Sequence, residues 1–122
     1  KARGAAAAVA EITPGRAELV TAGVGNIAMR MIDSHNGTSK SFICDNGTLG
    51  ANLRRVNQFT HAWPPNGIFV MHSDGLSSSW DLRNYPGLSE RHAGLISGVL
   101  YRDFRRERDD VTIVVTRRTP DA

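Results

Sequence analysis

The chain has 122 residues, of which 40% are hydrophobic and 22% are charged, which is the size and composition of one globular domain or a large part of one. Its longest apolar run is far shorter than the ~20 residues that a membrane span needs, and its N-terminus lacks a secretory signal, so we expect a cytoplasmic protein with no membrane partner. The net charge of +3 is small, and the most basic segment, residues 101–110, carries four arginines beside four acidic residues, so we expect a solvated helix end there and no nucleic-acid partner. A single cysteine, Cys44, excludes an internal disulfide framework.

The first half of the chain predicts one helix followed by strands. Residues 1–12 are rich in alanine and end at Pro14-Gly15, which favours a helix. An Asn-Gly pair at Asn36-Gly37 predicts a hairpin turn, and a second pair at Asn46-Gly47 predicts a turn that opens a loop to about Arg55. The predicted strands around these turns are residues 16–26, 27–33, 40–45, 56–63 and 68–72.

The second half predicts a helix and a last strand. Apolar residues recur at steps of three and four between Leu88 and Arg106, which is typical of an amphipathic helix. The segment "DDVTIVV" that follows is rich in β-branched residues and predicts a strand over residues 111–115. The order is helix, about five strands, helix and final strand. This order predicts an α+β fold with largely antiparallel pairing.

Three aspartates flank two of these strands. Asp74 follows strand 68–72, and Asp109 and Asp110 precede strand 111–115. If the two strands are antiparallel neighbours, the carboxylates meet at one edge of the sheet, where a cation would offset their repulsion. Mg²⁺ and Mn²⁺ prefer such oxygen ligands. The alternative is structural, because Asp-Gly commonly forms a turn and Asp-Asp can cap or solvate a strand.

Two neighbouring residues leave their roles open. His72 shares a strand face with Asp74, so it is either a further metal ligand or a packed, hydrogen-bonded histidine. The segment "SSSWDLRNYPGL" predicts a surface loop beside the site. Within that loop, Trp80 either shapes the access of a substrate or pins the loop to the core.

Four motifs in one order carry a family resemblance: "GVGNI", "DNGTLG", "HSDGLSSSWDL" and "RDDVTIVV". Together they resemble the C-terminal half of the metal-dependent protein phosphatases of type 2C, and most of all the bacterial SpoIIE-like and RsbX-like branch. The resemblance implies that Asp74 and Asp109 are metal ligands and that Asp110 supports them. It also implies a four-layer α-β-β-α sandwich, here only its later part, with about six strands and two main helices.

The chain departs from that family pattern at its start. An early acidic residue and an "Asp-Gly-x-Gly-His-Gly" motif, which the family uses to bridge two metals, do not occur in the sequence. The alanine-rich opening resembles the helix that directly follows this motif. We therefore expect residues 1–122 to be a single partial phosphatase domain that is inactive when made alone.

The implied function is hydrolysis of phosphoserine or phosphothreonine on a regulatory protein in bacterial signal transduction. In the family, two Mn²⁺ or Mg²⁺ ions activate a water for attack on the phosphoryl group, so no catalytic side chain acts as the nucleophile. The expected partner is a phosphorylated protein, such as an anti-sigma-factor antagonist in sigma factor regulation. The alternative is a non-catalytic phosphatase fold that serves as a protein-interaction or sensing module.

Overall fold

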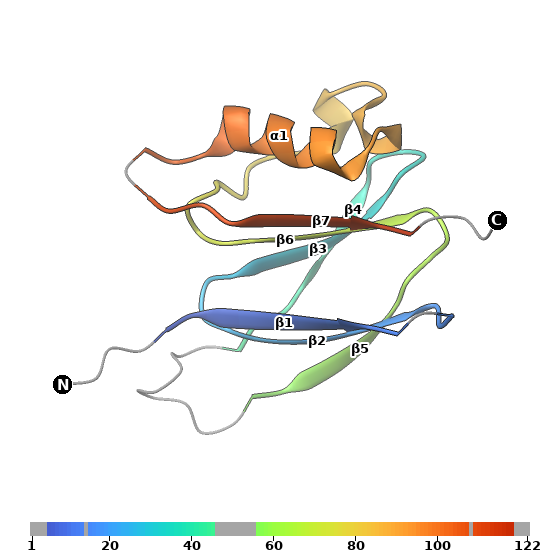
Figure 1. The fold of residues 1–122 in the computed structure, drawn as a ribbon, viewed down its shortest axis with the longest axis vertical. Coiled ribbons are helices and arrows are strands. Elements are labelled where there is room, and N and C mark those ends of the chain that lie inside the picture. The colour runs from blue at the N-terminus through green and yellow to red at the C-terminus, as the bar shows by residue number, and fades with distance from the viewer. Residues whose placement is uncertain (1–4, 14, 46–55, 108, 119–122) are drawn as a thin grey trace. The chain divides into compact units, whose positions relative to one another are not determined.

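The computed structural model describes residues 5–13, 15–45, 56–107 and 109–118, and these form two compact units (Figure 1). Unit 1 comprises residues 1–27 and 43–64, and unit 2 comprises residues 28–42 and 65–122. Each unit contains one antiparallel sheet. Among the described residues, no helix has the length and apolar character to cross a membrane.

Unit 1 is a three-stranded sheet. Its strands lie in the order β1-β2-β5, and both neighbouring pairs are antiparallel. Leu19 and Val24 of the central strand are buried, and Thr21 between them bonds to His61 across the sheet at 3.1 Å. The bounds are β1 (Ala7–Ile12), β2 (Glu18–Val24) and β5 (Gln58–Ala62).

The helix predicted over residues 1–12 is wrong, because β1 occupies Ala7–Ile12. This strand pairs with β2 along its whole length, from Ala7 opposite Val24 to Ile12 opposite Leu19. The helix propensity of alanine is a weak preference, and hydrogen bonding to a neighbouring strand overrides it here. The opening is therefore not, as the resemblance had implied, the helix that follows the family's metal motif.

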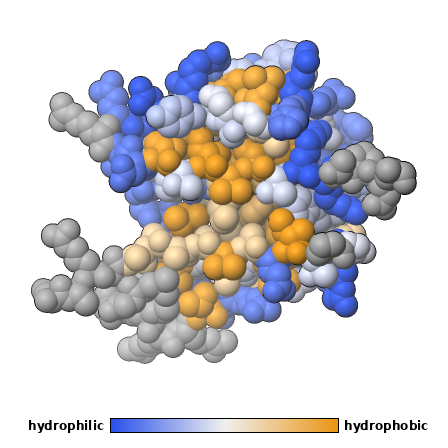
Figure 2. Space-filling model, viewed as in Figure 1, coloured by the Kyte–Doolittle hydropathy of each residue, from blue (hydrophilic) through white to orange (hydrophobic). Residues whose placement is uncertain are grey.

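Unit 2 is a four-stranded sheet with α1 packed on it, in the strand order β4-β3-β6-β7. Figure 1 shows α1 lying along one face of this sheet, nearest β7. Figure 2 shows apolar surface over this part of the unit. Leu95 and Tyr101 of α1 are half exposed. The bounds are β3 (Ala28–Asp33), β4 (Ser39–Phe42), β6 (Gly67–His72), the short 3-10 helices η1 (Leu82–Asn84) and η2 (Leu88–Glu90), α1 (Ala93–Phe104) and β7 (Ile113–Arg117).

The core of unit 2 lies between the sheet and the segment that follows β6. β6 is its most buried strand, since Ile68, Phe69 and Val70 are at most 1% exposed. Of the apolar residues whose period predicted the helix, Ile96 and Leu100 form the buried face of α1. The fully packed core residues are Ile32, Ile68, Val70, Leu76, Trp80, Leu82, Leu88, Ile96 and Leu100.

The predicted α+β fold with antiparallel pairing is confirmed, and all six predicted strands are present, each within a few residues of its expected bounds. The Asn36-Gly37 hairpin is also present, with a hydrogen bond from the Gly37 N–H to the Asp33 carbonyl at 2.7 Å. The predicted helix over residues 88–106 starts later, because η2 precedes α1 and His92 caps α1 by accepting from the Gly94 N–H. The predicted turn at Asn46-Gly47 lies outside the described residues.

Candidate functional site

The ends of β6 and β7 form the edge at which the sequence places its aspartates. The strands pair antiparallel, with His72 opposite Ile113. Beyond that pair, the Ser73 N–H donates to the Thr112 carbonyl at 3.0 Å, and the Thr112 N–H donates to Ser73 Oγ at 3.0 Å. The turn that carries Asp74 is therefore tied to the segment that enters β7.

Gly75 brings this turn against the Asp110 backbone. A Cβ built on Gly75 would lie 2.0 Å from the Asp110 carbonyl oxygen, far closer than any side-chain carbon can approach. On the other side, the Gly75 carbonyl accepts from the Arg106 N–H at 2.8 Å, and Leu76 forms a bridge with Arg105. We call residues 73–76 the Asp74 turn. It is held between the end of α1 and the start of β7, with room for a glycine alone at position 75.

The structure places the Asp74 turn against the Asp110 backbone at the paired ends of β6 and β7, as antiparallel pairing requires. Asp74, Asp109 and Asp110 are all exposed, and each lies next to the strand end that the sequence indicated. Their exposed carboxylates are of the donor type that Mg²⁺ and Mn²⁺ prefer. Within the described part of the chain, however, no three histidine, cysteine or acidic side chains are grouped to hold a metal. Ligation of a metal ion by Asp74 and Asp109 therefore stays a prediction.

His72 is a packed, hydrogen-bonded histidine. It is 2% exposed, and its Nδ1 lies 2.8 Å from the Ser73 carbonyl oxygen. Its Nε2 lies 3.0 Å from Trp80 Nε1, and an indole nitrogen can only donate. The ring is therefore neutral, with the proton on Nδ1 donated to Ser73 and Nε2 accepting from Trp80. Because both nitrogens are used, the structural interpretation of His72 holds and the ligand interpretation does not.

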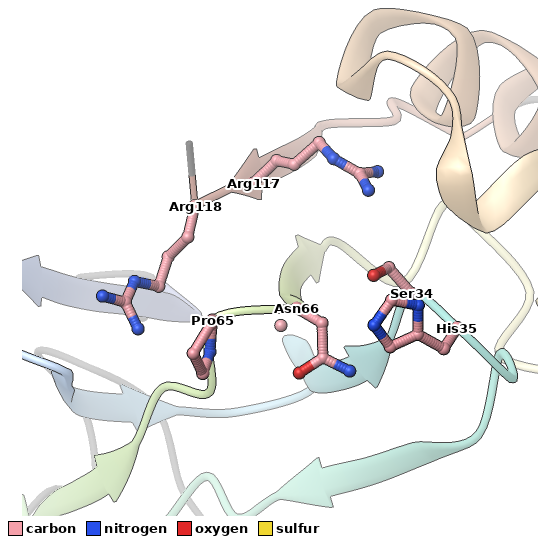
Figure 3. Close-up of a pocket in the computed structure, with 7 residues that line it drawn as sticks. Ser34, His35, Pro65, Asn66, Arg117 and Arg118 are labelled. Carbon is pink, nitrogen blue, oxygen red and sulfur yellow. The ribbon is translucent and has the colours of Figure 1, made fainter. Parts of the chain in front are cut away.

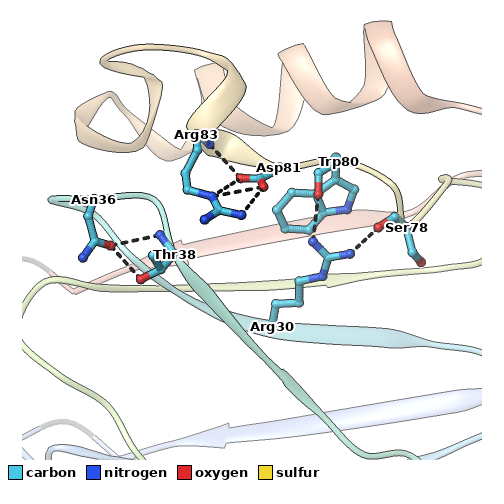
Figure 4. A network of polar contacts seen from close by, with 7 residues as sticks. All are labelled: Arg30, Asn36, Thr38, Ser78, Trp80, Asp81 and Arg83. Carbon is cyan, nitrogen blue, oxygen red and sulfur yellow. Dashed lines mark hydrogen bonds and ion pairs between the residues drawn. The ribbon is translucent and has the colours of Figure 1, made fainter.

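Trp80 pins its loop to the core. Its side chain is 2% exposed and packs within the core of unit 2. The Arg30 guanidinium lies 4.0 Å from the centre of the indole ring, donates to the Trp80 carbonyl at 2.9 Å, and donates to the Ser78 carbonyl (Figure 4). Of the two roles that the sequence left open for Trp80, the structure shows the anchoring one.

Arg30 is a residue that the sequence analysis did not single out. It lies on β3 and holds the loop after β6 by hydrogen bonds to the Ser78 and Trp80 carbonyls and by a cation–π contact with the Trp80 ring. The sequence did contain a signal for this role, because Arg30 is a basic residue within the alternating apolar pattern of strand 27–33. The loop continues into η1, where Asp81 accepts from the Arg83 backbone and side chain (Figure 4). These hydrogen bonds lower the pKa of Asp81 to about 2.

Comparison with known proteins identifies the fold. No family model matches the chain, and no curated protein matches it. A structure of RsbX in complex with magnesium matches with a TM-score of 0.74 over 93% of this chain, at 23% sequence identity. A structure of the bacterial stressosome, a modular system adapted to control secondary messenger signalling, matches with a TM-score of 0.74 over 92% of the chain, also at 23% identity. The SiaA-PP2C domain of Pseudomonas aeruginosa matches with a TM-score of 0.52 over 82% of the chain, at 17% identity.

The chain has a type 2C phosphatase fold. The resemblance to the RsbX-like branch is thereby confirmed at the level of fold. The chain spans only part of these proteins, namely 55% of the RsbX structure, 58% of the stressosome chain and 50% of the SiaA domain. The type 2C fold gives the aspartate edge of unit 2 a structural context, while the activity of the whole protein is a separate question.

The buried His72 makes the stability of this type 2C fold depend on pH. Burial lowers the pKa of His72 from its usual value of 6.5, and the charge of Arg30 adds to this shift, while the hydrogen bond to Ser73 opposes it. The folded state thus binds the proton less readily than the unfolded chain. The contribution of neutral His72 to the free energy of unfolding is complete above pH 6.5 and is lost as the pH falls through the lowered pKa of the folded state. The free energy of unfolding then falls by up to about 1.4 kcal/mol per pH unit.

His72→Gln tests this dependence, because a glutamine carries both a donor and an acceptor but does not titrate. Urea unfolding of the full-length protein at pH 7.5, 6.5 and 5.5 should show the wild type losing stability relative to His72→Gln as the pH falls. Parallel pH profiles for the two proteins would show that His72 does not control this dependence.

Proposed function

We propose that the chain is part of a metal-dependent protein serine/threonine phosphatase of the SpoIIE-like, RsbX-like branch. The observation that carries this proposal is the close contact of the Asp74 turn with the Asp110 backbone, where β6 ends and β7 begins, in a type 2C fold. Two segments that each bear exposed carboxylates are held together there by one backbone hydrogen bond and one from the Thr112 N–H to the Ser73 hydroxyl. An arrangement that gathers negative charge at a rigid edge favours a bound cation.

Asp74 and Asp109 would hold Mn²⁺ or Mg²⁺ in this proposal. Such an ion, when bound, activates water and neutralises the charge that develops on a phosphoryl group. The described residues supply too few donors for two ions, so the remaining ligands would come from other parts of the full-length protein. The magnesium complex of the similar RsbX structure supports the choice of metal.

The residues of this chain would act by positioning. Ser73 and Thr112 fix the spacing of the two acidic segments through their paired hydrogen bonds. The contact of Gly75 with Asp110 keeps the turn from moving away from β7. Asp74 and Asp109 would then hold the metal with their orientation already set, which lowers the cost of organising the site during the reaction.

The proposed substrate is phosphoserine or phosphothreonine on a regulatory protein in the bacterial cytoplasm, such as an anti-sigma-factor antagonist. The similarity to RsbX and to a stressosome structure supports a place in phosphoprotein signalling. A second candidate is a non-catalytic phosphatase fold that recognises a partner protein. It is favoured by the lack of a complete metal-ligand group among the described residues.

The full-length protein should hydrolyse a phosphoserine peptide in the presence of Mn²⁺ and lose this activity when EDTA removes the metal. Release of inorganic phosphate over time measures the reaction. The non-catalytic alternative predicts that the peptide binds without turnover at any Mn²⁺ concentration. Turnover that persists in EDTA would contradict the metal-dependent mechanism.

A further inference from the structure

A pocket of about 280 Å³ opens at the end of the unit 2 sheet that lies opposite the aspartate edge (Figure 3). β6 begins there at Gly67 and β7 ends there at Arg117, whereas the Asp74 turn follows the other end of β6. The lining includes Ser34, His35, Asn66, Arg117 and Arg118. The pocket is therefore separated from the proposed metal edge by the length of the two strands.

The lining of this pocket is cationic. Two consecutive arginines, Arg117 and Arg118, contribute guanidinium groups. Next to the lining, the Asp33 carboxylate accepts from the His35 N–H at 2.8 Å and from Asn66 Nδ2 at 2.7 Å. Arg117 Nη1 donates to the carbonyl oxygens of Ser89 and Arg91, each at 2.8 Å. These acceptors hold the side chain in place but are neutral. Within the described part of the chain, no carboxylate offsets the charge of Arg117.

Ser34 adds a fixed hydroxyl donor. The residue is 5% exposed, its N–H donates to the Asn66 carbonyl at 2.9 Å, and its own carbonyl accepts from Ser89 Oγ at 2.8 Å. Its backbone is thus fixed, while its hydroxyl makes no hydrogen bond to another described residue. Figure 3 shows Ser34 and His35 on one side of the pocket and Arg118 on the other, and the Arg117 side chain extending from β7 toward the segment whose carbonyls it binds.

We propose that this pocket binds a small phosphate group, either inorganic phosphate or a phosphate monoester. A phosphate monoester carries about −1.5 to −2 charges near pH 7 and has three acceptor oxygens, so it can make more charge-assisted contacts with guanidinium groups than a carboxylate can. Guanidinium groups donate charge-assisted hydrogen bonds to phosphate oxygens, and the Ser34 hydroxyl provides a further donor. A volume near 280 Å³ suits a ligand of few heavy atoms.

This phosphate pocket does not depend on the proposed phosphatase activity. Binding is measured in EDTA, so that phosphate cannot bind through a metal at the aspartate edge. The probes are inorganic phosphate, free phosphoserine and acetate, titrated into the full-length protein by calorimetry at low ionic strength, where screening is weak. We expect both phosphate probes to bind more tightly than acetate by about tenfold, which corresponds to one additional charge-assisted contact.

Arg118→Gln should weaken phosphate binding by about tenfold, and Ser34→Ala by a smaller factor. Lys40→Gln is the matched control. It removes one positive charge from exposed strand β4 of the same unit, outside the pocket, and should change the affinity by less than about twofold. Arg117 is not altered, because it also holds the Ser89 and Arg91 carbonyls. Circular dichroism checks that each variant is folded.

Three results would overturn the phosphate pocket. The first is that the wild-type protein fails to bind phosphate in EDTA. The second is that acetate binds as tightly as phosphate, and the third is that Lys40→Gln weakens phosphate binding as much as Arg118→Gln does. The last result would mean that overall charge, not the pocket, attracts the anion. If Arg118→Gln fails to fold, an unchanged affinity in Ser34→Ala overturns the proposal by itself.

Discussion

Asp74→Asn in the full-length protein should lower Mn²⁺-dependent phosphopeptide hydrolysis by on the order of 100- to 1,000-fold, and Asp109→Asn should do the same. Asparagine keeps the size of the side chain but removes the negative charge that would hold the metal. Both positions are exposed, so the substitutions leave the core of unit 2 intact and the fold should persist. Initial rates at several Mn²⁺ concentrations measure the effect, and the melting temperature checks the fold.

The control for these variants is Glu90→Gln, which removes an exposed carboxylate from η2 of the same unit, away from the aspartate edge. It should keep near wild-type turnover. If Asp74→Asn and Asp109→Asn also keep it, they are not metal ligands. A loss of activity that high Mn²⁺ partly restores supports weakened metal binding, whereas a loss in all three variants points to a general effect of surface charge.

Much of the fold follows from local sequence patterns. The alternation in strand 27–33, the β-branched run in "TIVV" and the Asn-Gly hairpin are local signals, and the structure confirms each of them. The opening strand β1 could not be found this way. Its alanines favour a helix when considered alone, and only pairing with the following strand β2, from Ile12 opposite Leu19 to Ala7 opposite Val24, determines its conformation.

The position of the candidate site could be predicted from these local patterns, but the contacts around it could not. Antiparallel pairing of two recognisable strands places Asp74 beside Asp110, and this needs no side-chain detail. The contacts that hold the loop after the Asp74 turn are different in kind. Arg30 reaches Trp80 across 50 residues of sequence, and the hydrogen bond from Trp80 to His72 depends on the packing of a whole loop. No periodicity encodes such contacts, so their roles could not be assigned from the sequence.

Gly75→Ala should destabilise unit 2 by about 3 kcal/mol, because the new methyl group would overlap the Asp110 backbone. The added Cβ would lie 2.0 Å from the Asp110 oxygen and 2.8 Å from its carbonyl carbon. A backbone carbonyl cannot rotate away as the tip of a flexible side chain can. The Asp74 turn must therefore separate from β7, which would also weaken the hydrogen bonds between Ser73 and Thr112.

Gly98→Ala is the matched control for this last variant. Gly98 lies inside α1 with nothing within 4 Å of a built Cβ, and alanine favours a helix over glycine by about 1 kcal/mol, so this variant should be more stable than the wild type. Urea unfolding of the full-length protein measures both changes. Equal stability of the two variants would mean that the turn can move away from Asp110 at no cost. In that case the edge is not rigid and does not hold its carboxylates in a fixed orientation, whatever the activity of the protein proves to be.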